Sequence, residues 1–316
     1  MKFIENLNDG ERVAGIYLCK SKALAVTKNG KEYFSLILQD RTGTIDGKIW
    51  EPHSMGIDDF EALDYIDING DVTNFNGTLQ ISIKRVRKAH EGEYNEGDYL
   101  PTTDMDITKL YESLLKCVSM VENPYLHELL EKFFVTDKEF SEKFKKHSAA
   151  KSMHHAFIGG LLQHTMAVAN LCYYYCKQYP MINRDLLLTA ALVHDMGKIW
   201  ELSEFPVNDY TDEGQLLGHI IIGVEKIGRI ADEIEDFPPV LLNELKHCIL
   251  AHHGELEYGS PKKPALIEAL ALHFADNTDA KLQAMSEILG KPTSQTGEWT
   301  GYQRMFESNV RKTKGI

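Results

Sequence analysis

The first 90 residues alternate between hydrophobic and polar positions, which is the pattern of β-strands that bury one face. Turn sequences such as Asn29-Gly30 and Asn76-Gly77, which accept the positive φ of tight hairpins, interrupt this pattern. Stretches rich in β-branched or aromatic residues predict strands over 12–20, 31–39, 44–50, 65–73 and 79–86. Five strands in so short a segment indicate a small all-β barrel.

The same alternation assigns the faces of the second and third predicted strands. The face expected in the barrel core carries Phe34, Leu36, Leu38, Ile45, Gly47 and Ile49. Tyr33, Lys48 and Trp50 fall on the opposite face, where aromatic rings can stack on bases and a lysine can neutralise a phosphate. The aromatic residues could instead pack against another domain. Lys84 belongs to a basic cluster over 84–88, which is either a further binding surface or a solvated strand end.

A polar stretch without periodicity, 91–106, follows the strands and is interpreted as a linker. From Ile107 onward, apolar residues recur with the helical period of 3.6. The sequence therefore predicts a barrel domain over 1–90, a linker over 91–106 and an all-α domain over 107–316.

Two helix starts can be predicted in the second domain. Asn123 can cap a helix in which Pro124 takes the first position, and Thr136 with Glu139 matches a capping box. The tail from Gly290 is rich in turn residues. It also carries three aromatic residues at helical spacing, which indicate a segment anchored on the body: Trp299, Tyr302 and Phe306.

Composition and charge exclude several classes of protein. No apolar run approaches the ~20 residues of a membrane span, and the amino terminus lacks the features of a secretory signal, so a cytoplasmic protein without a membrane partner is expected. The five cysteines show no CxxC spacing and are interpreted as reduced thiols. The formal net charge is −13, of which residues 1–90 contribute −1 and residues 91–316 contribute −12. An acidic protein does not attract nucleic acid by bulk charge, so a polyanionic substrate must meet local basic groups or metal ions.

Candidate chemistry concentrates in the helical part, where ten of the 13 histidines lie between His147 and His273. Asp195 and Asp276 fall among apolar residues of predicted helices. Burying an ionised carboxylate costs several kcal/mol unless it is paired, so each needs a positive partner. Carboxylates and imidazoles that converge from separate helices suit a divalent ion such as Mn²⁺ or Fe²⁺. A helical scaffold that has lost its metal is the alternative.

The ordered motifs GGLLQHT, ALVHDMGK, a histidine at 219, AHHGE and HFAD resemble the HD phosphohydrolase superfamily, in the variant with extra histidines for two metals. The resemblance implies a first ion held by His164, His194, Asp195 and Asp276, and a second held by Asp195, His219 and His252. His253 would be a third ligand of the second ion or a donor to the phosphate. Asp279 is a poorer match than Asp276 for the closing carboxylate and is expected to be solvated.

Two such ions clamp both oxygens of an in-line displacement at phosphorus and make hydroxide available at neutral pH. Asp195 would bridge them, and Lys198 could neutralise a phosphate oxygen. Lys198 could equally be a surface lysine at a helix C-terminus. His154 and His155 precede Gly159-Gly160 at the start of the predicted His164 helix, where imidazoles and backbone N–H groups could grip a phosphate.

The segment YFSLILQDRTGTIDGKIW resembles the oligonucleotide/oligosaccharide-binding (OB) fold, and across both domains the layout resembles the YhaM-family 3′-5′ exoribonucleases. That family implies hydrolysis of single-stranded RNA, and in some cases single-stranded DNA, from the 3′ end to nucleoside monophosphates. It also implies two divalent ions, with Mn²⁺ favoured over Fe²⁺, Co²⁺ or Mg²⁺. Two other functions stay open: a phosphodiesterase or phosphatase for cyclic or free nucleotides, and a nucleic-acid-binding protein with an inert HD domain. The sequence does not decide whether the chain forms homo-oligomers.

Overall fold

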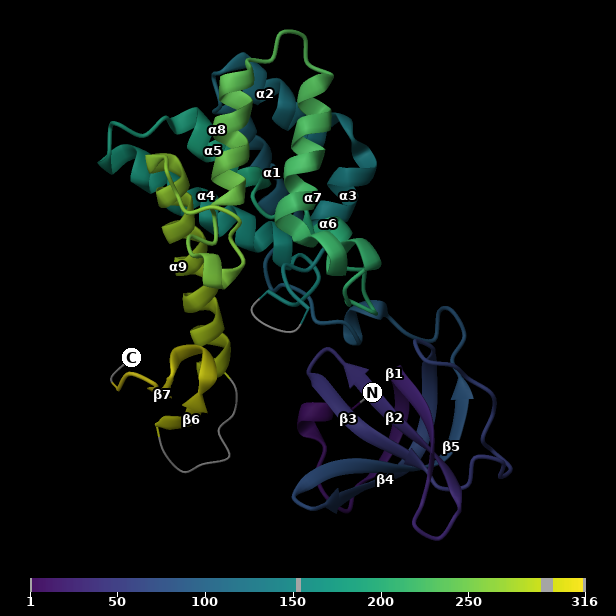
Figure 1. Cartoon of the computed structure of the whole chain (residues 1–316). Helices are drawn as coiled ribbons and strands as arrows, with labels where there is room; N and C mark the ends of the chain where they lie inside the picture. Colours follow the sequence, from purple (N-terminus) through teal and green to yellow (C-terminus); the bar gives the residue numbers. More distant parts are fainter. Residues whose placement is uncertain (1, 152–154, 291–297, 315–316) are drawn as a thin grey trace. The chain divides into compact units, whose positions relative to one another are not determined.

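The computed structural model describes residues 2–151, 155–290 and 298–314, which fold into two compact units (Figure 1). One unit comprises residues 1–102 with 204–208, and the other comprises 103–203 and 209–316. Within the described ranges, no helix combines the length and the apolar character that crossing a membrane requires.

Five strands of the first unit close into a barrel: β1 (Arg12–Val26), β2 (Glu32–Asp40), β3 (Gly43–Ile49), β4 (Tyr65–Phe75) and β5 (Thr78–Lys88). Their order around the barrel is β1-β2-β3-β5-β4, with β3 and β5 parallel and the other pairs antiparallel (Figure 1). This is the five-stranded arrangement of an OB-type barrel. The predicted fold of the amino-terminal part is therefore confirmed.

The predicted faces of β2 and β3 are also those of the structure. Leu36, Leu38, Ile45 and Ile49 are buried in the barrel core, while Phe34 is half-buried at its edge. Gly47 is also buried in the core, and a larger residue would crowd its neighbours, because a Cβ there would lie 3.1 Å from Ile83 Cδ1. The barrel interior is filled at this point without a side chain from β3.

The first strand is longer than its sequence pattern predicts, because it reaches Val26 rather than residue 20. A register shift between Cys19 and Ser21 interrupts the alternation of buried and exposed side chains. Beyond that shift, Leu24 and Val26 are exposed although they are apolar. Hydrophobic periodicity therefore could not mark the end of this strand.

Much of the segment between the predicted domains folds with the barrel. Tyr94 stacks on Tyr65 with ring centroids 3.8 Å apart, and Tyr99 meets the same ring edge-on at 5.0 Å. Gln39 Nε2 donates a hydrogen bond of 3.1 Å to the carbonyl oxygen of Tyr99. The barrel unit consequently continues to Thr102, past a 3₁₀ turn at Glu96–Asp98.

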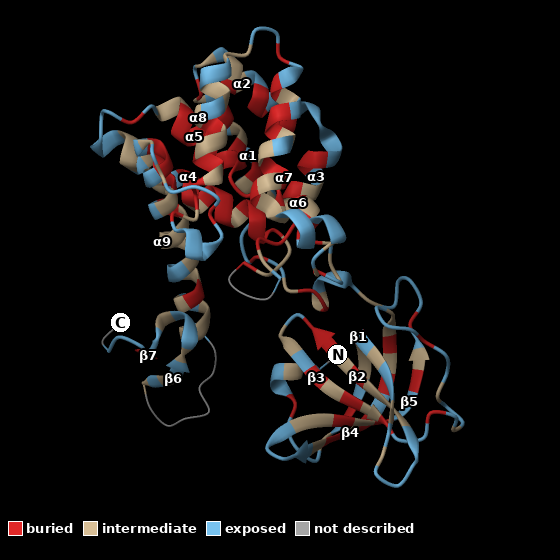
Figure 2. Ribbon diagram, viewed as in Figure 1, coloured by how far each residue is buried: buried red, intermediate tan, exposed pale blue. Residues whose placement is uncertain are grey.

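The second unit is helical and contains α1 (Ile107–Ser119), α2 (Pro124–Glu131), α3 (Lys138–Lys146), α4 (Gly160–Gln178), α5 (Arg184–Val193), α6 (Lys198–Glu201), α7 (Asp212–Asp232), α8 (Pro239–Leu250) and α9 (Ile267–Gly290). Helix α5 is buried throughout 186–193, and α4, α8 and α9 pack against it (Figure 2). A helix buried on every side carries apolar residues at nearly every position, which explains the run LLLTAALV, where Thr189 is the one polar residue. The all-α prediction is confirmed.

Of the two predicted helix starts, one is correct and one is displaced. The side chain of Asn123 accepts hydrogen bonds from the backbone N–H groups of Tyr125 and Leu126, so it caps α2. The predicted cap at Thr136 is wrong, because Thr136 ends the preceding π-turn (Lys132–Thr136) and Asp137 caps α3 through Phe140 N at 2.9 Å. A carboxylate accepts this bond more strongly than a hydroxyl.

The tail aromatic residues at helical spacing do not lie on an α-helix. Residues 299–311 form a hairpin of β6 (Trp299–Gln303) and β7 (Ser308–Arg311), joined by a 3₁₀ turn that contains Phe306. Three aromatic residues within eight positions fit a helical period by chance, whereas their β-propensity favours a strand. Part of the tail, 291–297, lies outside the described residues.

Candidate metal centre

The end of α5 carries the central carboxylate of the candidate site. His194 and Asp195 follow Val193 directly, and their side chains are 0% and 2% exposed. The two oxygens of Asp195 face different sets of residues. Oδ2 lies 3.5 Å from the Nε2 atoms of both His164 and His194, whereas Oδ1 faces His219 and His252.

The group around Oδ2 draws on α4, α5 and α9. His164 Nε2 lies 3.1 Å from Asp276 Oδ1 and 3.3 Å from His194 Nε2. Ligand atoms of His164, His194 and Asp276 all lie within 4.8 Å of one another. This spacing allows one ion to touch all three side chains.

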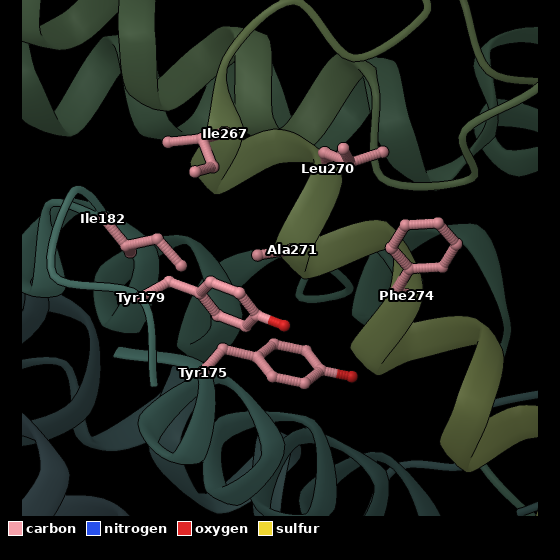
Figure 3. Close-up of a pocket in the computed structure, with 7 residues that line it drawn as sticks. All are labelled: Tyr175, Tyr179, Ile182, Ile267, Leu270, Ala271 and Phe274. Carbon is pink, nitrogen blue, oxygen red and sulfur yellow. The ribbon is translucent and has the colours of Figure 1, made fainter. Parts of the chain in front are cut away.

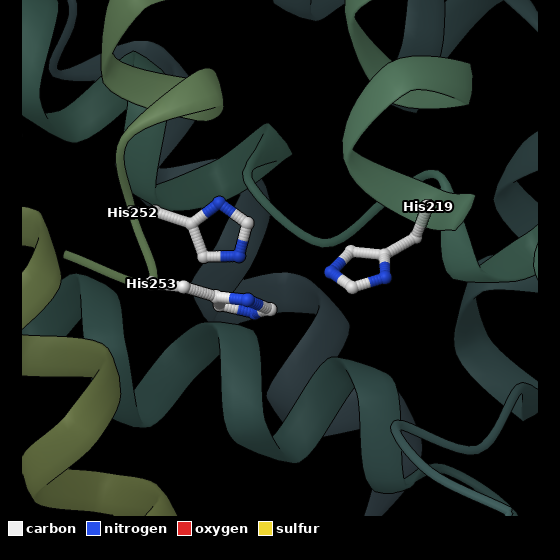
Figure 4. Close-up of side chains that lie close together, drawn as sticks. All are labelled: His219, His252 and His253. Carbon is white, nitrogen blue, oxygen red and sulfur yellow. The ribbon is translucent and has the colours of Figure 1, made fainter. Parts of the chain in front are cut away.

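The group around Oδ1 consists of histidines from α7 and from the turn after α8. His219 Nε2 and His252 Nε2 lie 3.4 Å and 3.6 Å from Asp195 Oδ1. Figure 4 shows the rings of His219, His252 and His253 turned toward one another, and their ligand atoms also lie within 4.8 Å. Asp195 therefore lies between two possible ligand sets and can contribute one oxygen to each.

Hydrogen bonds at the outer nitrogens orient these rings. The Nδ1 atoms of His194, His252 and His253 lie 2.9, 2.7 and 2.9 Å from the carbonyl oxygens of Ala191, Ile249 and Tyr258. A carbonyl only accepts, so each Nδ1 carries the proton and each Nε2 presents a lone pair. Carboxylates accept hydrogen bonds from the two remaining rings: Asp279 lies 2.7 Å from His164 Nδ1, and Glu201 lies 2.9 Å from His219 Nδ1.

Three buried atoms of this cluster have no hydrogen-bond partner among the described residues: Asp195 Oδ1, His219 Nε2 and His252 Nε2. Buried polar atoms are nearly always satisfied, and these three all present lone pairs to the same space. A cation placed between them would relieve their mutual repulsion. The oxygen and nitrogen donors, without a thiolate, suit a divalent ion such as Mn²⁺ or Fe²⁺.

The charges agree with a cation at this position. Burial opposes ionisation of Asp195, but Lys198 and the surrounding histidines outweigh it and hold the pKa of this carboxyl well below its usual range. Burial also lowers the pKa of His252 well below 6.5, and His253 and His194 lower it further. For His164 burial acts the same way, but hydrogen bonds to Asp276 and Asp279 raise its pKa to about 9. A proton on His164 Nε2 thus supplies positive charge that an ion would supply instead.

Lys198 is not a surface lysine at a helix C-terminus, so that alternative is wrong. It is the first residue of α6, its side chain is 15% exposed, and its Nζ lies 2.6 Å from Asp195 Oδ2. Burial disfavours the ammonium, yet the charge of Asp195 prevails and raises the pKa of Lys198. A permanent positive charge therefore stands beside the central carboxylate.

Glycines explain how the second histidine group is assembled. A Cβ on Gly197 would lie 2.0 Å from the carbonyl oxygen of His219, so only glycine lets the turn after Asp195 approach α7. Gly218, at φ 73°, breaks the helical conformation of α7 just before His219. Glu201 then accepts hydrogen bonds from both the backbone N–H and the ring of His219. Sequence reasoning missed Glu201, because no local pattern reveals its pairing with a residue 18 positions later.

The barrel residues that were predicted to bind nucleic acid lie on its outer surface. Trp50 is 45% exposed and its ring centroid lies 5.0 Å from that of Tyr33. Trp50 and Lys84 both line a hollow of about 290 Å³. Lys84 forms an ion pair with Asp71, and Lys48 Nζ donates to Ser35 Oγ at 2.7 Å. The two aromatic rings and Lys84 are available to a ligand, whereas Lys48 is largely covered.

Two histidines predicted to bind phosphate, His154 and His155, precede α4 in the sequence. His154 lies outside the described residues. His155 is buried, and its Nε2 lies 2.9 Å from Asp279 Oδ2. The backbone N–H groups of Gly160 and Leu161 donate to the carbonyl oxygens of Phe157 and His147. These two amides are therefore not free for a phosphate.

A separate hollow of about 400 Å³ is lined by apolar and aromatic side chains of α4, α9 and the turn between α4 and α5 (Figure 3). Its lining consists of Tyr175, Tyr179, Ile182, Ile267, Leu270, Ala271 and Phe274. None of these side chains is a carboxylate or an imidazole. The hollow is therefore unsuited to hydrolysis of a phosphodiester, although it is larger than the barrel hollow.

Several known proteins are similar to this chain. The sequence model of the HD domain family matches residues 161–281. The 3′-5′ exoribonuclease YhaM of Bacillus velezensis is 35% identical over 299 residues, which cover 94% of this chain and 92% of the relative. That of Geobacillus sp. strain WCH70 is 35% identical over 325 aligned positions, which cover 99% and 98%. The second OB-fold domain of replication protein A from Methanococcus maripaludis covers 29% of this chain and 96% of that chain, with 22% identity and a TM-score of 0.22.

Proposed function

This chain belongs to the YhaM family of 3′-5′ exoribonucleases, and we propose that it hydrolyses single-stranded RNA from the 3′ end, releasing nucleoside 5′-monophosphates. The match to both exoribonucleases extends over nearly the whole chain, which supports the same activity here. The observation that carries the chemistry is the set of unpartnered lone pairs around Asp195, since a bound cation would pair with all of them.

We propose two divalent ions, with Mn²⁺ preferred, as the resident cofactors. His164, His194, Asp195 and Asp276 would hold one, and Asp195, His219 and His252 the other. When bound, such a pair lowers the pKa of a bound water to around 7 and neutralises charge on phosphoryl oxygens. The fixed Nε2 lone pairs favour this role, because the protein has already oriented its ligands before any ion arrives.

Two side chains at the edge of the cluster are proposed to act on the substrate. Lys198 carries a permanent charge that can stabilise the developing negative charge on a phosphate oxygen. His253 is only partly buried, with its Nδ1 held by Tyr258, so it is either the outermost ligand or a donor to the phosphate. Measuring metal content in His253→Ala separates these roles, since a ligand lowers the content and a donor does not.

The barrel is proposed to bind the single strand through exposed aromatic rings. Stacking of a base on an aromatic ring contributes about 1–3 kcal/mol. We expect Trp50→Ala to raise KM for a long RNA by about 5- to 150-fold, while hydrolysis of a dinucleotide stays unchanged. Steady-state kinetics on both substrates would measure this. Trp299→Ala, which removes an exposed tryptophan of the tail hairpin, is the matched control. Equal loss for long and short substrates would refute a binding role for Trp50.

The proposed activity is tested by incubating the protein with 5′-labelled RNA, with and without Mn²⁺. A ladder that shortens from the 3′ end only when Mn²⁺ is present supports the proposal. Intact RNA together with cleavage of cyclic or free nucleotides would favour the small-nucleotide phosphodiesterase. Intact RNA without any hydrolysis would favour a binding protein with an inert HD domain.

A further inference from the structure

Asp279, one turn after Asp276 on α9, faces the side of His164 that points away from the candidate metal centre. The expectation that Asp279 is solvated is wrong, because its side chain is only 16% exposed. Its Oδ2 lies 2.7 Å from His164 Nδ1 and 2.9 Å from His155 Nε2. One carboxylate oxygen therefore joins two buried histidines that are nine residues apart in the sequence.

The chemistry of this contact determines how His164 can bind an ion. An ionised carboxylate only accepts hydrogen bonds, so His164 Nδ1 and His155 Nε2 are both donors. A neutral imidazole has one lone pair, and with Nδ1 protonated that pair is on Nε2. His164 Nε2 is the atom that faces Asp276, His194 and Asp195. A third ion between His155, His164 and Asp279 would need the proton on Nδ1 removed as well, which the geometry disfavours.

Backbone contacts on both sides of His155 fix its position. It has a left-handed conformation at φ 58°, its side chain is 1% exposed, and its carbonyl oxygen accepts from Ala149 N at 3.0 Å. A Cβ on Gly160 would lie 2.0 Å from that carbonyl oxygen, so only glycine allows the backbone at the start of α4 to pass this close to His155. The backbone N–H of His155 also donates to Glu287 of α9 at 3.4 Å. His155, which lies before α4, thus anchors the same oxygen of Asp279 that faces His164.

We propose that Asp279 and His155 are positioning residues that fix the orientation and the tautomer of His164, and thereby set the affinity of the ion that His164 holds. This inference rests on the proposed two-ion function. Carboxylate partners of metal-bound histidines typically change metal affinity by about 10- to 100-fold when they are replaced. Neither residue needs to touch RNA for this effect.

The test is a titration of the full-length protein with Mn²⁺ alone, in which free Mn²⁺ is followed by electron paramagnetic resonance. Asp279→Asn is expected to weaken binding at one of two sites by about 10- to 100-fold, and His155→Ala to weaken the same site by less. Asp232→Asn, which alters an exposed carboxylate at the end of α7, should leave both sites unchanged. At saturating Mn²⁺, KM for RNA should equal that of the unaltered protein in both variants.

Several results would overturn the inference. Unchanged Mn²⁺ affinity with a raised KM would make these residues substrate contacts, and loss of a third equivalent of Mn²⁺ would make Asp279 a ligand. If Asp279→Asn does not fold, His155→Ala decides by the same criteria. If the unaltered protein binds no Mn²⁺, the proposed function fails as well, so the two failures are distinguishable.

Discussion

Replacing Asp195 by asparagine is expected to reduce the rate of RNA hydrolysis on the order of 10³-fold or more, because both ligand sets lose the carboxylate that they share. The substitution keeps the shape of the side chain and removes its charge. Bound Mn²⁺ should fall below one equivalent per chain. Single-turnover hydrolysis of labelled RNA and elemental analysis of the dialysed protein would measure the two effects.

The same substitution should also weaken the fold, since Lys198 would keep a largely buried charge without its partner at 2.6 Å. Removing one member of a buried ion pair costs about 3–5 kcal/mol. Circular dichroism therefore has to accompany the assay, and His252→Ala, which leaves Lys198 paired, provides a second route to the same conclusion. Asp232→Asn is the matched control. Full activity in folded Asp195→Asn would exclude Asp195 from the reaction.

Gly197→Ala is expected to lower the rate by about 100-fold, because misplacing a reacting group by ~1 Å has an effect of that size. The added Cβ would lie 2.0 Å from the backbone carbonyl oxygen of His219, so either the turn after Asp195 or the part of α7 that carries His219 must move. Overpacking of this kind also destabilises a protein by about 1–3 kcal/mol. Thermal unfolding and hydrolysis kinetics would measure both.

Gly290→Ala is the control for that experiment, since no atom of the described residues lies within 4 Å of a Cβ built on Gly290. It should retain normal activity and stability. An unchanged rate of hydrolysis and unchanged thermal stability in Gly197→Ala would show that the close approach of Gly197 and His219 does not position the second ligand group.

Hydrophobic periodicity was sufficient for the fold class, because strands and helices that bury one face must repeat with periods of 2 and 3.6. It failed where geometry departs from those periods. The bulge near Cys19 hid the second half of β1, and the helical spacing of three tail aromatic residues did not reveal the hairpin that forms there. The cap at Asp137 was missed because both Thr136 and Asp137 can cap a helix.

The side chains predicted as ligands are brought together around Asp195, and the reason is physical: a buried carboxylate is stable only when it is paired with positive groups or a bound cation. The residues that orient those ligands were not predictable in this way. Glu201 meets His219 only because α6 and α7 pack together, and Asp279 meets His155 across 124 positions. Such partners depend on tertiary packing, which no local pattern in the sequence reports.

The most direct test of the account is a count of Mn²⁺ ions on the full-length protein by native mass spectrometry, at increasing Mn²⁺ and with RNA hydrolysis followed in parallel. The account predicts two equivalents per chain in the unaltered protein, with hydrolysis appearing as the second one binds. Hydrolysis at full rate by a protein that carries no metal, or saturation at two equivalents in His252→Ala and Asp276→Asn alike, would contradict it.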